Sequence, residues 1–468
     1  MPLARRALGL VGAILAAVAL GGCALPAPPL PTLTPEPDAT VESVPSIRPS
    51  TLDGITALSM ARAGDAAIAI EPVYFDGVES FNNLVDSIAL ARVDQYLGDR
   101  APAGFQVALP PDGLRLGDSA AAGDGLRVAT NVVLASGSWL GVRMRAEKDG
   151  VAIAQWTIYG DGTTDAAYPG DALVDPAQGD ALLAAAGGAP PESLGSLAIA
   201  TDGAVLLASG DGEPARVPAE AARPLLSDAG RSVQDAASSG AAFVPVATPG
   251  AQHVPCSLVA CVALTFDDGP SPETTPGLLD LLAKEQVAAT FFVEGQHVQT
   301  DPGIVAREHR DGHAVENHTW SHPDLATLAG PDIEQQISST DAAIVAAGVP
   351  EPTLARAPYG SAGGAVAASV RHPLIYWSVD AFDWQSLDPD VFVPRVLDRI
   401  APGGIVLMHD IYPSTVAGQE TIIATLRDRG YTFVTVPQLL SGYDLVDGQV
   451  YTCRGTVPSD AGPDCIGR

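Results

Sequence analysis

The stretch VALTFDDGP, residues 262–270, decides the fold. Five apolar or β-branched residues form a short strand pattern, and two adjacent carboxylates, Asp267 and Asp268, follow it directly. Adjacent carboxylates repel each other and lose solvation when buried, so the strand has to deliver them to an edge where they find partners. Gly269 and Pro270 bend the chain behind them. The stretch therefore predicts a buried strand whose carboxyl end opens into a site.

Residues 256–446 continue this pattern, because short apolar runs alternate with helical patterns. The expected strands are 259–266, 288–293, 375–379, 404–408 and 432–436. The expected helices are near 275–285, 302–310, 333–347, 391–400 and 419–429. Alternation of this kind predicts a parallel sheet, and this many repeats predicts an α/β barrel. The active site of such a barrel lies at the carboxyl ends of its strands.

Two histidines downstream have the spacing of metal ligands. His318 and His322 stand at i and i+4, which would place both on one face of a helical turn. Taken alone, this spacing is more often a coincidence than a metal site. The Asp pair in the same barrel makes a metal site the favoured interpretation. Two imidazoles and one carboxylate leave open positions on Zn²⁺ for water and substrate.

Three further segments carry polar groups at or near expected strand ends. Arg356–Gly360 is expected to be a loop, Asp380–Trp384 follows the strand 375–379, and Ile405–His409 ends another strand. Each Arg, Asp or His would be weak evidence by itself. Together with the Asp pair and the two histidines, they supply a base, metal ligands, a positioning cation and an acid.

These five segments resemble, in order, the five motifs of the NodB-homology polysaccharide deacetylases, which form carbohydrate esterase family 4. The segments are Thr265–Pro270, His318–His322, Arg356–Gly360, Asp380–Trp384 and Ile405–His409. The resemblance covers about residues 256–440 and implies a distorted (β/α) barrel. It also implies metal-dependent hydrolysis of N-acetyl, sometimes O-acetyl, groups on a glycan. Ala357 stands where the family often has a second proline, and this change touches no functional role.

The resemblance implies a metal site and a base. Asp268, His318 and His322 would hold a divalent metal, with zinc expected first and cobalt or a similar ion as the alternative. Asp267 would be the base that deprotonates the attacking water. Arg356 would pair with Asp267 and keep it ionised and oriented.

The resemblance also implies an acid and a pocket. The backbone N–H of Tyr359 would help to hold the oxyanion. His409 would protonate the departing amine, and Asp383 would hydrogen-bond His409 and raise its pKa. Leu407 and Trp384 would line a small pocket for the acetyl methyl group.

The net charge indicates which classes of partner the chain can bind. The chain has 25 Lys and Arg against 55 Asp and Glu, a formal net charge of −30, and no basic cluster beyond its first residues. Such a chain cannot neutralise many phosphates, which excludes nucleic acid as a partner. An uncharged glycan needs no basic groove.

Five histidines outside the motifs are expected to be surface or structural residues: His253, His297, His309, His313 and His372.

Residues 1–22 have the pattern of an export signal, because an apolar core too short for a membrane span follows a positive start. Leu20-Gly21-Gly22-Cys23 resembles the lipobox of bacterial lipoproteins, which implies a lipid on Cys23 that anchors the protein in the membrane. An ordinary secretory signal is the alternative. Residues 23–50, rich in Pro and Thr, are expected to be an extended tether. The expected location is the extracellular face of the cell membrane.

Residues 51–227 predict a smaller α+β domain with an antiparallel sheet. The expected elements are a helix over 81–97, strands over 126–133, 139–146 and 151–158, and a short strand pair at 196–200 and 204–208. Residues 159–162 and 171–175 resemble the extracellular domain of lysozyme-sensing anti-sigma factors, which implies a wall component or a lysozyme as a partner. Residues 228–255 are expected to be a linker, and 447–468 a C-terminal tail.

Four cysteines remain after Cys23, an even count that suggests two disulfides in an exported protein. Three pairings are open, and the local one, Cys256 with Cys261 and Cys453 with Cys465, is preferred. The crossed pairings would attach the tail to the first barrel strand. A Cys₄ zinc site is a further option, although the spacings do not resemble paired zinc knuckles.

The leading hypothesis is an anchored deacetylase of a cell-wall glycan, with peptidoglycan amino sugars as the expected substrate. A deacetylase of chitin, xylan or another exopolysaccharide is the first alternative. A non-enzymatic lipoprotein that binds the wall or a lysozyme is the second, and degraded motifs would favour it. None of the motifs is degraded.

Overall fold

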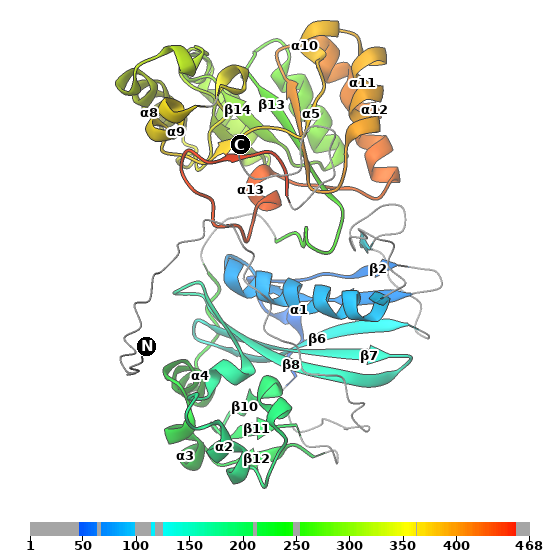
Figure 1. Cartoon of the computed structure of the whole chain (residues 1–468), viewed down its shortest axis with the longest axis vertical. Helices are drawn as coiled ribbons and strands as arrows, with labels where there is room; N and C mark the ends of the chain where they lie inside the picture. The colour runs from blue at the N-terminus through cyan, green and yellow to red at the C-terminus, as the bar shows by residue number, and fades with distance from the viewer. Residues whose placement is uncertain are drawn as a thin grey trace, which may run out of the picture.

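The computed structural model describes residues 46–62, 67–98, 114–117, 125–208, 213–246, 253–361 and 363–454. These residues form two units stacked along the long axis, the N-terminal one below and the second above (Figure 1). The expected signal at 1–22, the lipidation site Cys23 and Cys465 lie outside the described residues. Within the described part, no helix combines the length and the apolar character that a membrane crossing needs.

The N-terminal unit is built on a seven-stranded sheet of order β5-β2-β3-β6-β7-β8-β9. Its strands are β2 (Met60–Arg62), β3 (Ile68–Glu71), β5 (Arg115–Leu116), β6 (Leu126–Ser136), β7 (Trp139–Lys148), β8 (Val151–Asp161) and β9 (Ala166–Pro169). The predicted strands correspond to β6, β7 and β8. The prediction of an antiparallel sheet is wrong at one place, because β3 pairs with β6 in parallel. Helix α1 (Glu79–Leu97) lies against one face of the sheet (Figure 1).

A small subdomain lies at the other end of this unit (Figure 1). It contains β10 (Ala198–Ile199), β11 (Val205–Leu207), β12 (Ala215–Val217), α2 (Gly179–Ala185), α3 (Ala219–Ala222) and α4 (Asp228–Ser239). A separate pair, β1 (Ile55–Ala57) and β4 (Val73–Phe75), is antiparallel.

Helix α4 corrects the predicted linker over 228–255. Ser227 caps the helix by accepting a hydrogen bond from the Gly230 N–H, and Val233 and Ala237 are buried in the subdomain core. The segment was predicted as a linker because it is rich in Ala, Ser and Gly, and because the helix buries only a narrow apolar stripe. The end of the predicted tether is also attached, because Ile47 bridges Val132 of β6.

The second unit is a distorted (β/α) barrel of parallel strands. Its main sheet has the order β15-β14-β13-β18-β17, and β19 also pairs with β13. These strands are β13 (Cys261–Asp267), β14 (Thr290–Val293), β15 (Ala314–Asn317), β17 (Val379–Asp380), β18 (Gly404–His409) and β19 (Thr432–Phe433). Bridges from Asn317 through Ala355 to Leu374 continue the curve to β16 (Leu374–Ile375) and β20 (Val450–Tyr451).

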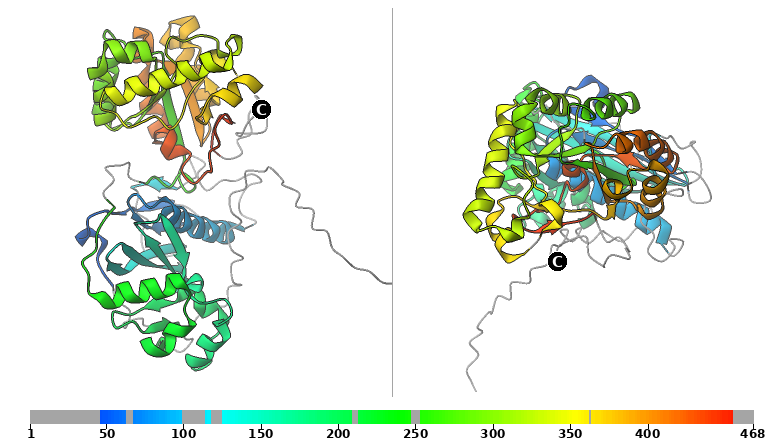
Figure 2. Two further views of the ribbon diagram at one scale, coloured as in Figure 1. Left: turned by 90° about the vertical axis from the view of Figure 1, so that its left-hand side faces the viewer. Right: turned by 90° about the horizontal axis from the view of Figure 1, so that it is seen from above.

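Helices surround these strands when the molecule is seen from above (Figure 2). They are α5 (Thr275–Glu285), α6 (Gly295–Thr300), α7 (Pro302–Arg310), α8 (Gly330–Ala346), α9 (Gly364–Ser369), α10 (Asp383–Ser386), α11 (Pro389–Arg399), α12 (Pro413–Asp428) and α13 (Val436–Leu439). The central strands β13, β14 and β18 are buried on both sides, as parallel strands are when helices cover them. The fold class, a distorted barrel preceded by an α+β unit, is confirmed.

Three details of the barrel differ from the sequence-based expectations. The single strand expected over 375–379 is two short strands, β16 and β17. The tail expected from 447 begins as part of the barrel, because β20 pairs with β16 and Cys453 bridges Gly404. Strand β15 was not expected, since its four residues include a buried Glu and Asn.

The predicted local disulfide between Cys256 and Cys261 is confirmed. Cys453 is disulfide-bonded as well. Because Cys465 lies outside the described residues, its pairing with Cys453 stays a prediction.

The N-terminal end of β13 faces the first unit. Cys261 and Ala263 share one apolar core with residues of α1, such as Val85 and Ala89. The carboxyl ends of the barrel strands, where a site is expected, therefore point away from the N-terminal unit (Figure 1).

His253 forms a buried polar junction between the two units. Its Nε2 lies 2.9 Å from Asp86 Oδ2, and its Nδ1 lies 3.5 Å from Glu79 Oε2. Asp86 also accepts hydrogen bonds from Tyr74 (2.6 Å) and Ser257 (3.3 Å). Burial lowers the pKa of His253, but the two carboxylates outweigh it and raise this pKa to about 9. An imidazolium therefore neutralises carboxylates of α1 at the junction.

We expect His253→Ala to lower the free energy of unfolding by about 3 kcal/mol at pH 7, because it leaves Asp86 buried without its cation. Because folding raises the pKa of His253, its contribution is complete below pH ~6.5 and is lost as the pH rises through about 9. Urea unfolding at several pH values measures both effects. The exposed His309 is the control, and an equal loss in His309→Ala would contradict the expectation.

Candidate active site

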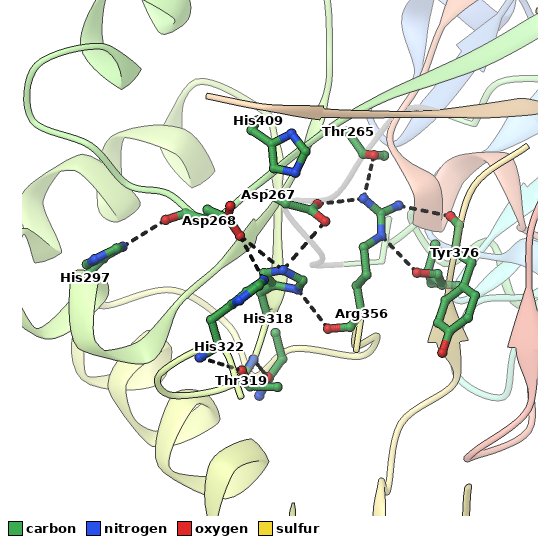
Figure 3. A network of polar contacts seen from close by, with 12 residues as sticks. Thr265, Asp267, Asp268, His297, His318, Thr319, His322, Arg356, Tyr376 and His409 are labelled. Carbon is green, nitrogen blue, oxygen red and sulfur yellow. Dashed lines mark hydrogen bonds and ion pairs between the residues drawn. The ribbon is translucent and has the colours of Figure 1, made fainter. Parts of the chain in front are cut away.

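Asp267 and Asp268 lie at the carboxyl end of β13, where the chain leaves the barrel. Asp267 is the register partner of His409 at the end of β18. Asp268 has a φ of 74°, a left-handed conformation that turns the chain, and its carboxylate lies apart from that of Asp267 (Figure 3). At Gly269 a Cβ would lie 2.4 Å from a carboxylate oxygen of Asp410, so only glycine fits there.

Asp268, His318 and His322 form a group of three candidate ligand atoms that all lie within 4.8 Å of one another. Asp268 Oδ1 lies 3.3 Å from His318 Nε2 and 3.4 Å from His322 Nε2 (Figure 3). This oxygen is buried and has no hydrogen-bond partner. A buried carboxylate oxygen facing two imidazole nitrogens without a hydrogen bond is the donor set of a divalent metal, so the residues present fit such an ion.

Hydrogen bonds and charges orient these groups. His318 Nδ1 lies 2.8 Å from the carbonyl oxygen of Arg356, which can only accept, so Nδ1–H donates to it and Nε2 is the nitrogen that faces Asp268. Burial raises the pKa of Asp268, but His318 and the neighbouring histidines outweigh it and bring this pKa to about 2.

The segment from His318 to His322 is a loop, so the predicted helical turn is wrong. Thr319 and His322 have φ values of 68° and 56°, which no helix contains. Side chains take the place of helical hydrogen bonds: Asn317 Oδ1 accepts from the Thr319 N–H at 2.7 Å. Gln336 Oε1, from α8, accepts from the N–H groups of Trp320 and Ser321.

Arg356 and Asp267 form a fully buried ion pair. Arg356 Nη1 lies 2.6 Å from Asp267 Oδ1 and 2.7 Å from the hydroxyl of Thr265 (Figure 3). The other donors reach the carbonyl oxygens of Ile375 and Tyr376 at 2.9 and 3.0 Å. Burial lowers the pKa of Arg356, and Asp267 partly offsets this. The guanidinium therefore fixes one oxygen of Asp267.

His409 and Asp383 form a second buried pair. Asp383 Oδ1 lies 2.9 Å from His409 Nδ1, and Oδ2 accepts from the His409 N–H at 2.9 Å and from the Thr415 hydroxyl at 2.6 Å. Burial lowers the pKa of His409, but the hydrogen bond and charge of Asp383, with smaller contributions from Asp267 and Asp268, raise it to about 9. This geometry gives an imidazolium at neutral pH.

The three other predicted site residues lie at the same end of the barrel. Leu407 is two residues before His409 on β18, shares its face of the strand, and is 5% exposed. Tyr359 and Trp384 are 71% and 45% exposed. The Tyr359 ring contacts the His322 ring at 4.7 Å, so Tyr359 lies beside the ligand group.

Sequence reasoning missed one residue next to the ligand group. His297 Nδ1 lies 2.8 Å from the carbonyl oxygen of Asp268 (Figure 3). The available signal was its place three residues after Glu294, which follows the buried strand β14 at the same edge of the barrel. Among the other histidines, His309 is exposed, His313 is buried, and His372 Nε2 lies 3.0 Å from Asp341.

Comparisons with known proteins agree with this geometry. The family model for "Polysaccharide deacetylase" matches residues 257–372. The peptidoglycan-N-acetylglucosamine deacetylase PgdA of Listeria monocytogenes (strain 10403S) is 42% identical over 190 residues, 41% of this chain and 41% of that protein. The peptidoglycan-N-acetylmuramic acid deacetylase PdaC of Bacillus subtilis is 40% identical over 178 residues, 38% of each chain.

The chain thus spans less than half the length of these two relatives. A third relative is shorter: the chitooligosaccharide deacetylase of Sinorhizobium fredii is 39% identical over 195 residues, 38% of this chain and 90% of that protein. Since 90% of this relative is matched at 39% identity, and the family model matches residues 257–372 of the barrel, the chain belongs to the polysaccharide deacetylase family.

Proposed function

We propose that this protein removes N-acetyl groups from a cell-wall glycan, with peptidoglycan amino sugars as its substrate. The observation that carries the proposal is the placement of a base and an acid beside one ligand group. Asp267 and His409 are register partners on neighbouring strands, and Asp268 follows Asp267 directly. Hydrolysis of an amide needs these components together, because its leaving amine is poor until it is protonated.

Asp268, His318 and His322 would hold the metal. A divalent cation bound there would supply a Lewis acid for the acetyl carbonyl and for the attacking water. Zinc suits two imidazoles and one carboxylate, and cobalt is the alternative ion. The proposal for this metal rests on the orphaned Asp268 Oδ1 between two imidazoles.

Asp267 would take the proton from the attacking water. Arg356 holds Oδ1 at 2.6 Å, which leaves Oδ2 on the side of the ligand group, 3.7 Å from His318 Nε2. Arg356 thus gives the buried carboxylate a cationic partner and fixes its orientation before substrate binds.

His409 would give a proton to the departing sugar amine. Its Nδ1 is hydrogen-bonded to Asp383, so Nε2 is the nitrogen that can face the substrate. We further assign the backbone N–H of Tyr359 to the oxyanion and Leu407 and Trp384 to the pocket for the acetyl methyl group. Leu407 is buried and Trp384 is half exposed, as the floor and rim of a small pocket require.

The substrate and the location are parts of the same proposal. PgdA and PdaC carry peptidoglycan in their names, and the export signal and lipobox pattern would place this chain at the extracellular face of the cell membrane. Because a chitooligosaccharide deacetylase is also similar to this chain, a chitin-like glycan is the second candidate substrate. For the N-terminal unit, we propose binding of a wall component or a lysozyme.

We expect acetate release from purified peptidoglycan, and its loss after treatment with a chelator. Asp267→Asn should lower kcat/KM by about 10²–10⁴-fold, because the base is removed, and circular dichroism checks that the variant folds although Arg356 loses its anion. The exposed Asp332→Asn serves as the control. Chitooligosaccharide and acetylated xylan in the same assay rank the substrates, and full activity of Asp267→Asn would refute the mechanism.

We expect Arg356→Lys to destabilise the protein by about 2 kcal/mol and to reduce activity strongly. A lysine keeps the charge but lacks the fork of donors that reaches Asp267, Ile375 and Tyr376 at once, so buried carbonyl oxygens lose partners. Urea unfolding and acetate release measure the two effects. Arg310→Lys, at an exposed position, is expected to change neither.

We expect Asp383→Asn to move the alkaline limb of the kcat profile to lower pH by about 1–2 units. Asp383 raises the pKa of His409, and His409 is active when protonated, so removing this charge makes the proton leave earlier. The measurement is kcat between pH 5 and 11, with the exposed Asp390→Asn for comparison. An alkaline limb at the same pH in both variants would show that His409 is not the acid.

A further inference from the structure

The segment Glu294–His297, which follows β14, contacts both loops that carry the ligand group. The Glu294 N–H donates to the carbonyl oxygen of Gly269, in the loop after Asp268, at 3.0 Å. The next two N–H groups, of Gly295 and Gln296, donate to the carbonyl oxygens of Thr319 and Trp320, both at 3.0 Å. One short segment therefore connects the aspartate loop to the histidine loop.

The side chain of His297 adds a contact to a ligand residue itself. Its Nδ1 lies 2.8 Å from the carbonyl oxygen of Asp268 (Figure 3). A carbonyl oxygen can only accept, so His297 Nδ1–H is the donor. Asp268 has a φ of 74°, a conformation that costs an aspartate free energy unless its surroundings hold it. The hydrogen bond from His297 holds the peptide group of this residue in place.

Close packing at Gly295 shows how tightly the segment fits the histidine loop. A Cβ at this position would lie 2.4 Å from Trp320 Cε3 and 2.7 Å from the hydroxyl of Thr340. Only a residue without a side chain can bring its backbone this near to the indole. The distance between the two loops is therefore determined by backbone contact and not by flexible side chains.

We propose that Glu294–His297 sets the spacing between Asp268 and the two ligand histidines, and that His297 is a positioning residue of the metal site. The inference rests on the proposed function, since it takes the ligand group to bind a divalent cation. His297 does not touch the ligand atoms, and acts through the backbone of Asp268. Residues behind metal ligands typically change metal affinity by about 10–100-fold when they are replaced.

The chain offers an isosteric test of the hydrogen bond. In His297→Asn, an amide N–H stands at the place of Nδ1 and can still donate to the Asp268 carbonyl oxygen. In His297→Leu, a methyl group of similar reach fills the space without a donor. His309→Leu, at an exposed position of α7, is the matched control.

The experiment titrates Zn²⁺ into the metal-free full chain by calorimetry, with circular dichroism as a check on folding. We expect His297→Leu to bind Zn²⁺ about 10-fold or more weakly, and His297→Asn and His309→Leu to stay within about 3-fold of the unchanged chain. If His297→Leu does not fold, His297→Ala takes its place. Unchanged affinity of the donor-free variant, or equal weakening by Leu and Asn, would overturn the inference. Absence of Zn²⁺ binding in the unchanged chain would refute the proposed metal site instead.

Discussion

The buried contact between Arg356 and Asp267 is the constraint on which the rest of the site depends. A guanidinium without exposure to water needs an anion, and Asp267 is the anion that β13 delivers. The same guanidinium donates to the hydroxyl of Thr265 in β13 and to the carbonyl oxygens of Ile375 and Tyr376, so it joins the strand of the Asp pair to the end of β16. These contacts orient the aspartate, and they also close the wall of the barrel behind it.

A second consequence of this contact is that the two neighbouring carboxylates have different closest partners. Asp267 pairs with Arg356. Asp268 has a left-handed backbone conformation, and its carboxylate faces His318 and His322. Adjacent carboxylates in one site repel each other, and each of these two has a neighbour of its own: Arg356 at Asp267, and the two histidines at Asp268. Asp267 Oδ2 also lies 3.7 Å from His318 Nε2, so the two carboxylates meet at the ligand group, where one would accept a proton and the other would bind the metal, as proposed.

The sequence predicted the barrel and the grouping of its polar ends, because buried parallel strands have a strong apolar signal and their carboxyl ends meet at one edge. It did not predict the loop at His318–His322, since the i, i+4 spacing is compatible with a helix until Asn317 and Gln336 satisfy the backbone N–H groups. It also missed His297, whose contact is with a backbone oxygen that no motif marks. In the N-terminal unit, α4 was missed because a narrow apolar stripe in an Ala- and Ser-rich segment resembles a linker.

The stacking of the two units affects how a glycan can approach the barrel. The described chain enters through the N-terminal unit, at the bridge between Ile47 and Val132, and the carboxyl ends of the barrel strands point away from that unit. With an anchor at Cys23, as proposed, the chain would be attached through the N-terminal unit, and the carboxyl ends of the barrel strands would lie on the side that this unit does not cover (Figure 1). A long glycan strand would then meet the catalytic mouth without passing the N-terminal unit.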